Sequence, residues 1–266
     1  MTLCKSNVFR AILFFGCVVL VGCIEKPVAR KDAFSSFIIA GHVENFAKME
    51  RLLKLYPDLI SERCHEETLL HNAAMVSQPT TVEFLLKHGA EINVRNKYGE
   101  TPLFLAVQSK RLENVVLLLN AGADLSIADS DDGESPLERA AGRGLPEIMK
   151  VLIEHGADVD RVNNGRTPLM KATEWNQPDA VDALLACKAK VNIRDSIGQT
   201  VLMHAIDRDN GLKSKSESAE DIRIVKSLLA AGADPDLARD GGDTPRSLAK
   251  KYKDKLPQIA KLLGVE

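Results

Sequence analysis

The sequence has few aromatic residues and little net charge. Aromatic residues make up 5% of its 266 residues, with a single tryptophan, and the net charge is −2. The scarcity of aromatic residues, beside abundant leucine and alanine, favours helices packed through small and aliphatic side chains over a β-sandwich. No long run of lysine or arginine supplies the clustered positive field that nucleic-acid binding requires, so we expect no nucleic-acid partner.

Catalytic and metal-binding motifs are also scarce. His65 and His71 lie six residues apart, on different faces of a helix, whereas a zinc-protease motif needs histidines at i and i+4. The acidic stretch from Asp129 to Gly133 is one residue too short for a calcium loop and has no closing glutamate. Neither a Gly-x-Ser-x-Gly motif nor a Gly-Lys-Ser/Thr phosphate loop occurs. We therefore expect no catalytic residue, no metal and no cofactor.

The N-terminal residues form a separate segment. Lys5 and Arg10 accompany an apolar stretch from Ala11 to Ile24, which is 14 residues long and shorter than the about 20 residues of an ordinary membrane-spanning helix. Positive charge followed by a short apolar stretch is typical of a secretory signal. The tetrapeptide Leu20-Val21-Gly22-Cys23 resembles the lipobox of bacterial lipoproteins.

This resemblance implies that residues 1–22 are a cleaved signal peptide, that Cys23 is lipidated, and that residues 23–32 are a tether. Several acyl chains on Cys23 would anchor the protein stably, since one chain alone binds only marginally. Because residue 24 is Ile and not Asp, the resemblance to lipoproteins of enteric-type bacteria implies a periplasm-facing lipoprotein of the outer membrane. An ordinary signal peptide and an uncleaved anchor remain alternatives.

A repeated pattern occupies the rest of the chain. Related short sequence motifs begin at Thr68, Thr101, Ser135, Thr167 and Thr200, and a further motif begins at Thr244. Their spacings are 33, 34, 32, 33 and 44 residues. A Gly-Ala-Glu or Gly-Ala-Asp motif recurs in register with these starts, at Gly89, Gly122, Gly156 and Gly232. A glycine also precedes the starts, at Gly99, Gly133, Gly165, Gly198 and Gly242. Patterns in register at this period indicate a repeat protein.

The unit resembles the ankyrin repeat, whose consensus carries Thr-Pro-Leu-His and Gly-Ala-Asp. The resemblance predicts an all-α solenoid of about five full helix-turn-helix units, joined by β-turns or hairpins, over residues 33–266. We expect repeats at 67–99, 100–133, 134–165, 166–198 and 199–242, an N-terminal cap at 33–66 and a C-terminal cap at 243–266. Caps are needed because ordering one unit costs at least about 1 kcal/mol per residue, which its own buried side chains barely offset.

Single residues refine this prediction. The threonine that starts each unit caps the first helix, and the proline after it fixes φ. Lys188 stands where other units have glycine, so it must adopt a left-handed φ or end its helix differently. The consensus histidine, which bridges turns by hydrogen bonds in the family, is kept only as His71. About 11 extra residues within 207–221 are either a tolerated insertion or an extra contact arm.

The cysteines of the repeat region predict no internal disulfide. Cys64 and Cys187 lie more than three repeats apart. Helix layers stack about 8–10 Å apart, whereas a disulfide needs Cα atoms within about 7 Å. We expect both thiols to be buried packing residues.

Proteins of this family usually grip a partner with the turn tips and the exposed positions of each first helix. Carried onto this sequence, those positions are Arg95, Lys97, Tyr98, Glu100, Gln108, Asp131, Glu134, Arg143, Asn164, Arg166, Glu174, Trp175, Arg194, Ile197, Gln199 and Arg208. Tyr98, Trp175 and Ile197 stand out, because large exposed apolar groups form interaction hot spots. Alternatively, Trp175 folds over the loop of its own repeat. The mixed Arg and Glu residues suggest a polar rim matched to one partner.

We therefore expect a monomeric, non-enzymatic module that binds another protein and contacts the membrane through lipidated Cys23. Two roles are open: an immunity protein that neutralises an effector acting in the periplasm, and an adaptor or stabiliser of a resident envelope enzyme. An envelope hydrolase on the same scaffold and a purely structural envelope protein are the competing alternatives.

Overall fold

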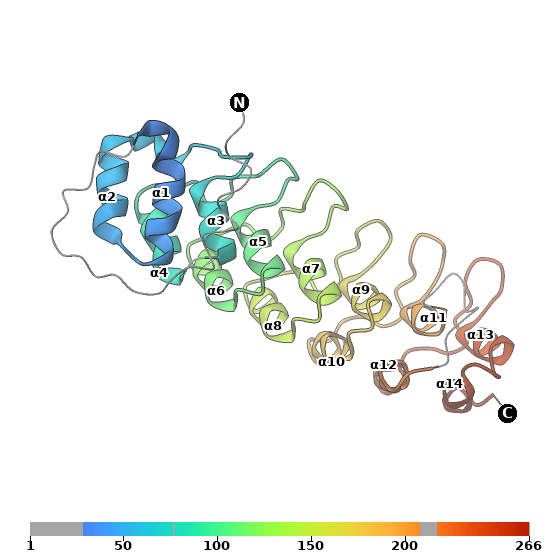
Figure 1. Ribbon diagram of the computed structural model, residues 1–266. Coiled ribbons are helices and arrows are strands. Elements are labelled where there is room, and N and C mark those ends of the chain that lie inside the picture. Colours follow the sequence, from blue (N-terminus) through green and yellow to red (C-terminus); the bar gives the residue numbers. More distant parts are fainter. Residues whose placement is uncertain (1–28, 77, 208–216, 266) are drawn as a thin grey trace.

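The computed structural model describes residues 29–76, 78–207 and 217–265. Within these ranges the chain is all-helical, with no strand and only isolated β-bridges such as that between Asn163 and Arg166. The helices follow one another in pairs along an elongated solenoid, and the loops that lead into each first helix project to one side (Figure 1). The predicted all-α solenoid is confirmed.

Two rows of short helices run along the solenoid. The first row contains α3 (Leu69–Val76), α5 (Pro102–Gln108), α7 (Pro136–Gly142), α9 (Pro168–Glu174), α11 (Val201–Ile206) and α13 (Pro245–Lys251). The second row contains α4 (Pro79–Lys87), α6 (Leu112–Asn120), α8 (Pro146–Glu154), α10 (Pro178–Ala186), α12 (Ala219–Ala230) and α14 (Pro257–Leu262). Each first helix packs against its own second helix and against the first helix of the next unit.

The N-terminal end is closed by a further helix pair. It consists of α1 (Arg30–His42) and α2 (Phe46–Leu55), with the 3-10 helix η2 (Pro57–Ile60) after it, and α1 packs against α3. The N-terminal cap expected at 33–66 contains α2, but α1 begins at Arg30, inside the stretch expected to be a tether. The expected C-terminal cap corresponds to α13 and α14.

Helix starts follow the repeated threonine. The side chains of Thr101, Thr167 and Thr200 each accept a hydrogen bond from the backbone N–H three residues later. Proline follows Thr101 and Thr167 at the first helical position, where its missing N–H costs nothing. Lys188 adopts the left-handed φ of +64°, so the first of its two predicted alternatives holds.

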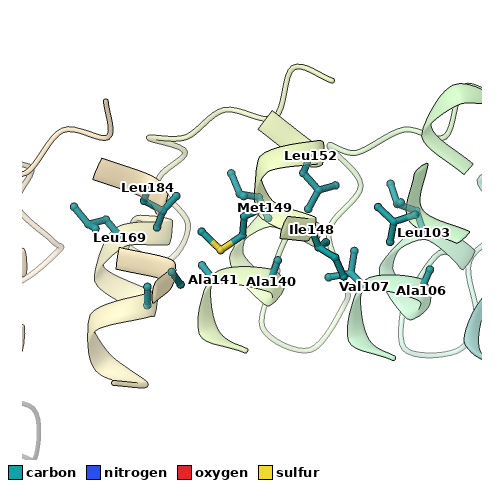
Figure 2. Packing of buried hydrophobic residues seen from close by; sticks show 14 of the residues in the cluster. Leu103, Ala106, Val107, Ala140, Ala141, Ile148, Met149, Leu152, Leu169 and Leu184 are labelled. Atoms are coloured by element: carbon teal, nitrogen blue, oxygen red, sulfur yellow. The ribbon is translucent and has the colours of Figure 1, made fainter. Parts of the chain in front are cut away.

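One apolar core runs through all units. Figure 2 shows Leu103 and Val107 of one unit, Ala140 and Met149 of the next, and Leu169 of a third in a continuous layer. Small residues such as Ala140 let first helices approach closely, and each unit buries a face that it cannot cover alone. Cys64 and Cys187 are free and only half-buried, so the expectation that both are buried is wrong.

Candidate functional site

The loops that project beyond the first row form one surface with that row. We call the turns 95–100, 128–134, 162–166 and 194–199, together with α5, α7, α9, α11 and the residue that follows each of these helices, the turn face. Most of the predicted partner-binding residues lie on this surface. Its geometry depends on how the turns are held and on which side chains they leave exposed.

The turn before α5 is held by its own side chains. The backbone N–H of Asn96 donates to the carbonyl of Glu100 at 2.9 Å. The Oδ1 atom of Asn96 accepts from the backbone N–H groups of Tyr98 and Glu100, at 2.9 and 3.0 Å. Such a local side-chain bond fixes a turn without help from other elements. The tip residue Tyr98 is therefore presented on a closed, internally bonded loop.

Aspartates hold two further turns in the same way. The Oδ1 atom of Asp129 accepts from the backbone N–H of Glu134 at 2.9 Å. The Oδ1 atom of Asp195 accepts from the N–H groups of Ile197 and Gln199, at 3.0 and 2.7 Å. A charged acceptor strengthens such bonds, so these turns are also firmly closed.

Neighbouring turns are bonded to one another. The N–H of Ser130 donates to the carbonyl of Tyr98 at 2.7 Å, and Nη2 of Arg95 donates to the carbonyl of Ala128 at 3.1 Å. Gly99 makes this approach possible: its φ is +74°, and a Cβ there would lie 2.8 Å from the backbone nitrogen of Ser130. The first two turns thus form a continuous edge.

A row of buried ion pairs lies below the turns. The Asp129 and Glu134 carboxylates each contact the Arg139 guanidinium, at 3.1 and 3.0 Å, and Glu134 also contacts Nζ of Lys171 at 2.6 Å. The Glu134 side chain is only 7% exposed. Because Arg139 belongs to α7 and Lys171 to α9, Glu134 ties two repeats together.

The same arrangement recurs one repeat further along. The Oε1 atom of Glu174 lies 3.1 Å from Nε of Arg166 and 3.3 Å from Nδ1 of His204. The other ring nitrogen of His204 lies 2.9 Å from Oδ2 of Asp195. His204 therefore joins the end of α9 to the turn before its own helix α11.

Large apolar side chains remain exposed on this rigid surface. Tyr98 and Ile197 occupy matching turn tips and are 46% and 61% exposed. Trp175, the residue directly after α9, is 62% exposed. A Cβ added at Gly142 would lie 3.4 Å from Cδ1 of Trp175, so the indole lies along α7 of the preceding repeat. Trp175 thus contacts the preceding repeat while most of its side chain stays exposed.

The predicted partner-binding residues differ in exposure. The exposed ones are Arg95, Lys97, Tyr98, Asp131, Arg143, Asn164, Arg166, Trp175, Arg194 and Ile197. Glu100, Gln108 and Glu174 are half-buried. The expectation of exposure is wrong for Glu134 and Gln199, which are 5% and 8% exposed, because Glu134 is enclosed by cations and Gln199 lies at the base of its turn. Arg208 and Cys23 lie outside the described residues.

The prediction from sequence missed the basic side chains beneath the turns. Arg139, Lys171 and His204 occupy the same place in three consecutive units, each four residues after the capping Ser or Thr. Each contacts a turn or helix-end carboxylate. A comparison of the repeats position by position contains this signal, because a basic residue recurs at a place where an isolated unit gives no reason for one.

The single consensus histidine bridges two turns as expected. His71 is fully buried; its Nδ1 accepts from the backbone N–H of Thr68 at 3.1 Å, and its Nε2 donates to the carbonyl of Glu100 at 3.1 Å. Burial lowers the pKa of His71 to about 4, so the ring is neutral at pH 7. In the third unit Glu138 takes over the local bond, accepting from the N–H of Ser135 at 2.8 Å.

The described part of the chain contains no group of three or more His, Cys, Asp or Glu side chains placed to hold a metal ion. In the same residues, no helix has both the length and the apolar character needed to cross a bilayer. What the turn face offers is a bonded framework, paired charges below, and exposed apolar and basic groups above. Such a surface is suited to contact with a macromolecule.

Comparison with known families bears directly on this surface. A family model described as ankyrin repeats (3 copies) matches residues 37–129 and 125–195. The B-cell lymphoma 3 protein homolog of Mus musculus is 28% identical over 232 residues, which cover 84% of this chain and 49% of that protein. The chain thus spans about half the length of this curated relative.

Solved structures show the same architecture. The ankyrin repeat domain of Bcl-3, described as a unique member of the IkappaB protein family, superposes with a TM-score of 0.73 at 27% identity, covering 86% of this chain and 97% of that domain. An ankyrin repeat domain from Acinetobacter baumannii gives a TM-score of 0.65 at 32% identity, covering 74% of this chain and 96% of that one.

Proposed function

Because this chain belongs to the ankyrin-repeat family, we propose that its turn face binds another protein and that the chain has no catalytic activity of its own. The observation that carries the proposal is the exposure of Tyr98, Trp175 and Ile197 on turns and helix ends that are closed by internal hydrogen bonds. Exposed aromatic groups on a pre-ordered surface lose little entropy on binding and are typical of hot spots.

The proposal includes attachment to a bacterial membrane through lipidated Cys23. Its support is the lipobox-like tetrapeptide Leu20-Val21-Gly22-Cys23 and the short apolar stretch before it. Helix α1 begins at Arg30, so six residues separate it from Cys23. At no more than about 3.5 Å for each of the seven Cα–Cα steps, the start of α1 lies within about 25 Å of the lipidated residue. Within this proposal the protein faces the periplasm from the outer membrane.

The partner that we propose is a protein effector that acts in the periplasm, which the chain neutralises as an immunity protein. The alternative partner is a resident envelope enzyme that the chain stabilises or recruits. The two roles differ in a genetic test. Deletion of the gene should make cells sensitive to an effector encoded beside it if the chain is an immunity protein. If the deletion leaves the cells no more sensitive to any effector encoded nearby, the immunity role is contradicted and the adaptor role is favoured.

A pull-down tests the binding function itself. The full chain serves as bait in extracts of its own host, beside a Tyr98→Ala, Trp175→Ala double variant. The matched control replaces two exposed apolar residues away from the turn face, Val43→Ala and Leu112→Ala, which are 56% and 37% exposed. We expect one protein to be captured in a fixed ratio, lost with the turn-face variant and kept with the control. Equal capture by all three baits would contradict the assignment of the surface.

A further inference from the structure

The end of α9 carries an exposed indole in cationic surroundings. Trp175 lies along α7, where a Cβ at Gly142 would meet both the indole and Cγ of Lys171, at 3.4 and 3.5 Å. Arg143 follows Gly142 directly and is exposed. The Arg166 guanidinium reaches Glu174, the residue before Trp175. We call Gly142, Arg143, Arg166, Lys171 and Trp175 the Arg143–Trp175 patch.

We propose that the Arg143–Trp175 patch binds an acidic segment of the partner protein that carries an apolar side chain at its centre. This inference rests on the proposed protein-binding function and specifies the chemistry of the partner. The apolar side chain packs on the exposed face of the Trp175 indole. Carboxylates on either side of it pair with the guanidinium of Arg143 and with the exposed parts of Arg166 and Lys171.

The two carboxylates that contact cations of the patch, Glu134 and Glu174, are already paired. Glu134 contacts both Arg139 and Lys171, and its side chain is 7% exposed. Glu174 contacts Arg166 and His204, and its side chain is 17% exposed. Glu134 is buried and Glu174 is half-buried, and each faces two basic groups, so neither presents much negative charge to an approaching partner.

The cations of the patch are in excess. The Arg143 side chain is exposed and has no ion-pair partner among the residues that the structure describes. The side chains of Arg166 and Lys171 are 48% and 21% exposed, although each has one carboxylate contact. Three cations therefore face solvent beside the buried Glu134 and the half-buried Glu174. The exposed acids Asp131 and Asp132 precede α7, whereas Arg143 follows it. Arg166 also precedes its helix, but its guanidinium reaches the carboxylate of Glu174, the last residue of α9.

Electrostatic complementarity across an interface mainly sets specificity and association rate, while buried aromatic groups supply affinity. Single-stranded nucleic acid also uses cations and stacked aromatic groups. A net charge of −2 for the whole chain disfavours that partner, since nucleic-acid binding needs an extended positive field. The combination of one indole and a local cationic excess fits an acidic protein segment better.

The test measures binding of defined probes to the full chain by fluorescence anisotropy. Two labelled peptides share a central Leu-Phe pair; one has three Glu or Asp residues on each side, and the other has Lys at the same places. A labelled oligo-uridine of similar length is the third probe. The variants are Arg143→Glu and Trp175→Ala. The controls are Lys150→Glu, which makes the same charge change on a 71% exposed side chain of α8, and Leu112→Ala.

We expect the acidic peptide to bind at least about tenfold more tightly than the basic one, which corresponds to about 1.4 kcal/mol. Arg143→Glu and Trp175→Ala should each weaken acidic-peptide binding at least about fivefold, whereas both controls leave it unchanged. The inference is overturned if the basic peptide or oligo-uridine binds as well as the acidic one, if no probe binds, or if Lys150→Glu has the same effect as Arg143→Glu. In those cases, capture of a partner in the pull-down would still support the protein-binding function. Only a failed pull-down would contradict that function.

Discussion

Replacement of Glu134 by Gln tests the buried ion pairs that join the repeats. The Glu134 carboxylate lies 3.0 Å from Arg139 and 2.6 Å from Lys171, and its side chain is 7% exposed. Glutamine keeps the shape of the side chain but removes its charge. Arg139 then retains Asp129, whereas Lys171 loses the one ion-pair partner that it has among the described residues.

The expected loss of stability can be estimated from burial. Removal of one partner from a fully buried ion pair costs about 3–5 kcal/mol, because a charge is left without compensation. The Lys171 side chain is 21% exposed and Arg139 is 24% exposed, so both regain part of their solvation. We therefore expect Glu134→Gln to lower the free energy of unfolding by about 2 kcal/mol.

The matched control is Glu154→Gln on the second row. Glu154 is 58% exposed and lies 3.9 Å from Lys150, and such surface pairs contribute at most about 0.5 kcal/mol. Urea unfolding at pH 7, followed by helical circular dichroism, compares both variants with the wild type. If the two substitutions lower the free energy of unfolding by amounts within about 0.5 kcal/mol of each other, the reasoning about buried pairs is refuted.

Three further predictions concern the backbone and one histidine. Gly99→Ala should lower the free energy of unfolding in urea by at least about 1 kcal/mol more than Gly122→Ala. Both glycines have positive φ, but a Cβ at Gly99 would lie 2.8 Å from the backbone of Ser130, whereas nothing lies within 4 Å of a Cβ at Gly122. Equal losses of stability would contradict the close approach of the turns. Lys188→Gly should raise stability by about 0.5–1 kcal/mol, because glycine adopts the φ of +64° without strain, and an unchanged melting temperature would count against that strain. The pKa of His71 is about 4 in the folded chain and about 6.5 in the unfolded chain, so the unfolded chain binds the proton first as the pH drops. The free energy of unfolding should therefore fall by up to about 3 kcal/mol between about pH 6.5 and pH 4. His71→Gln should flatten this pH dependence, and a wild-type profile identical to that of the variant would refute the prediction.

The repeat architecture was predictable because its determinants are local. The hydroxyl of Thr101 caps a helix that begins with Pro102, and both residues act within one turn of backbone. Helix α1 was not predicted, and its residues give a physical reason. Its apolar residues lie on several faces, with Phe37 buried and Ile39 50% exposed, and its N-cap residue Ala29 makes no side-chain hydrogen bond to the first turn.

The fine structure of the turn face depends on contacts between repeats, which one unit does not contain. Glu134 precedes a capping serine and looks like an exposed loop residue, yet Lys171 of the next repeat reaches back and buries it. The location of Trp175 at a helix end was predictable from the repeat. Its contact with α7 was not, because that contact exists only where the preceding unit has Gly142.

The measurement that tests the central claim most directly is hydrogen–deuterium exchange of the full chain, alone and with the protein captured in the pull-down. Binding through the turn face predicts slower exchange in residues 95–100 and 194–199 and at the end of α9, with α6, α8 and α10 unchanged. Protection confined to α6, α8 and α10, with the turns exchanging as in the free protein, would show that the second row binds the partner and would contradict the account.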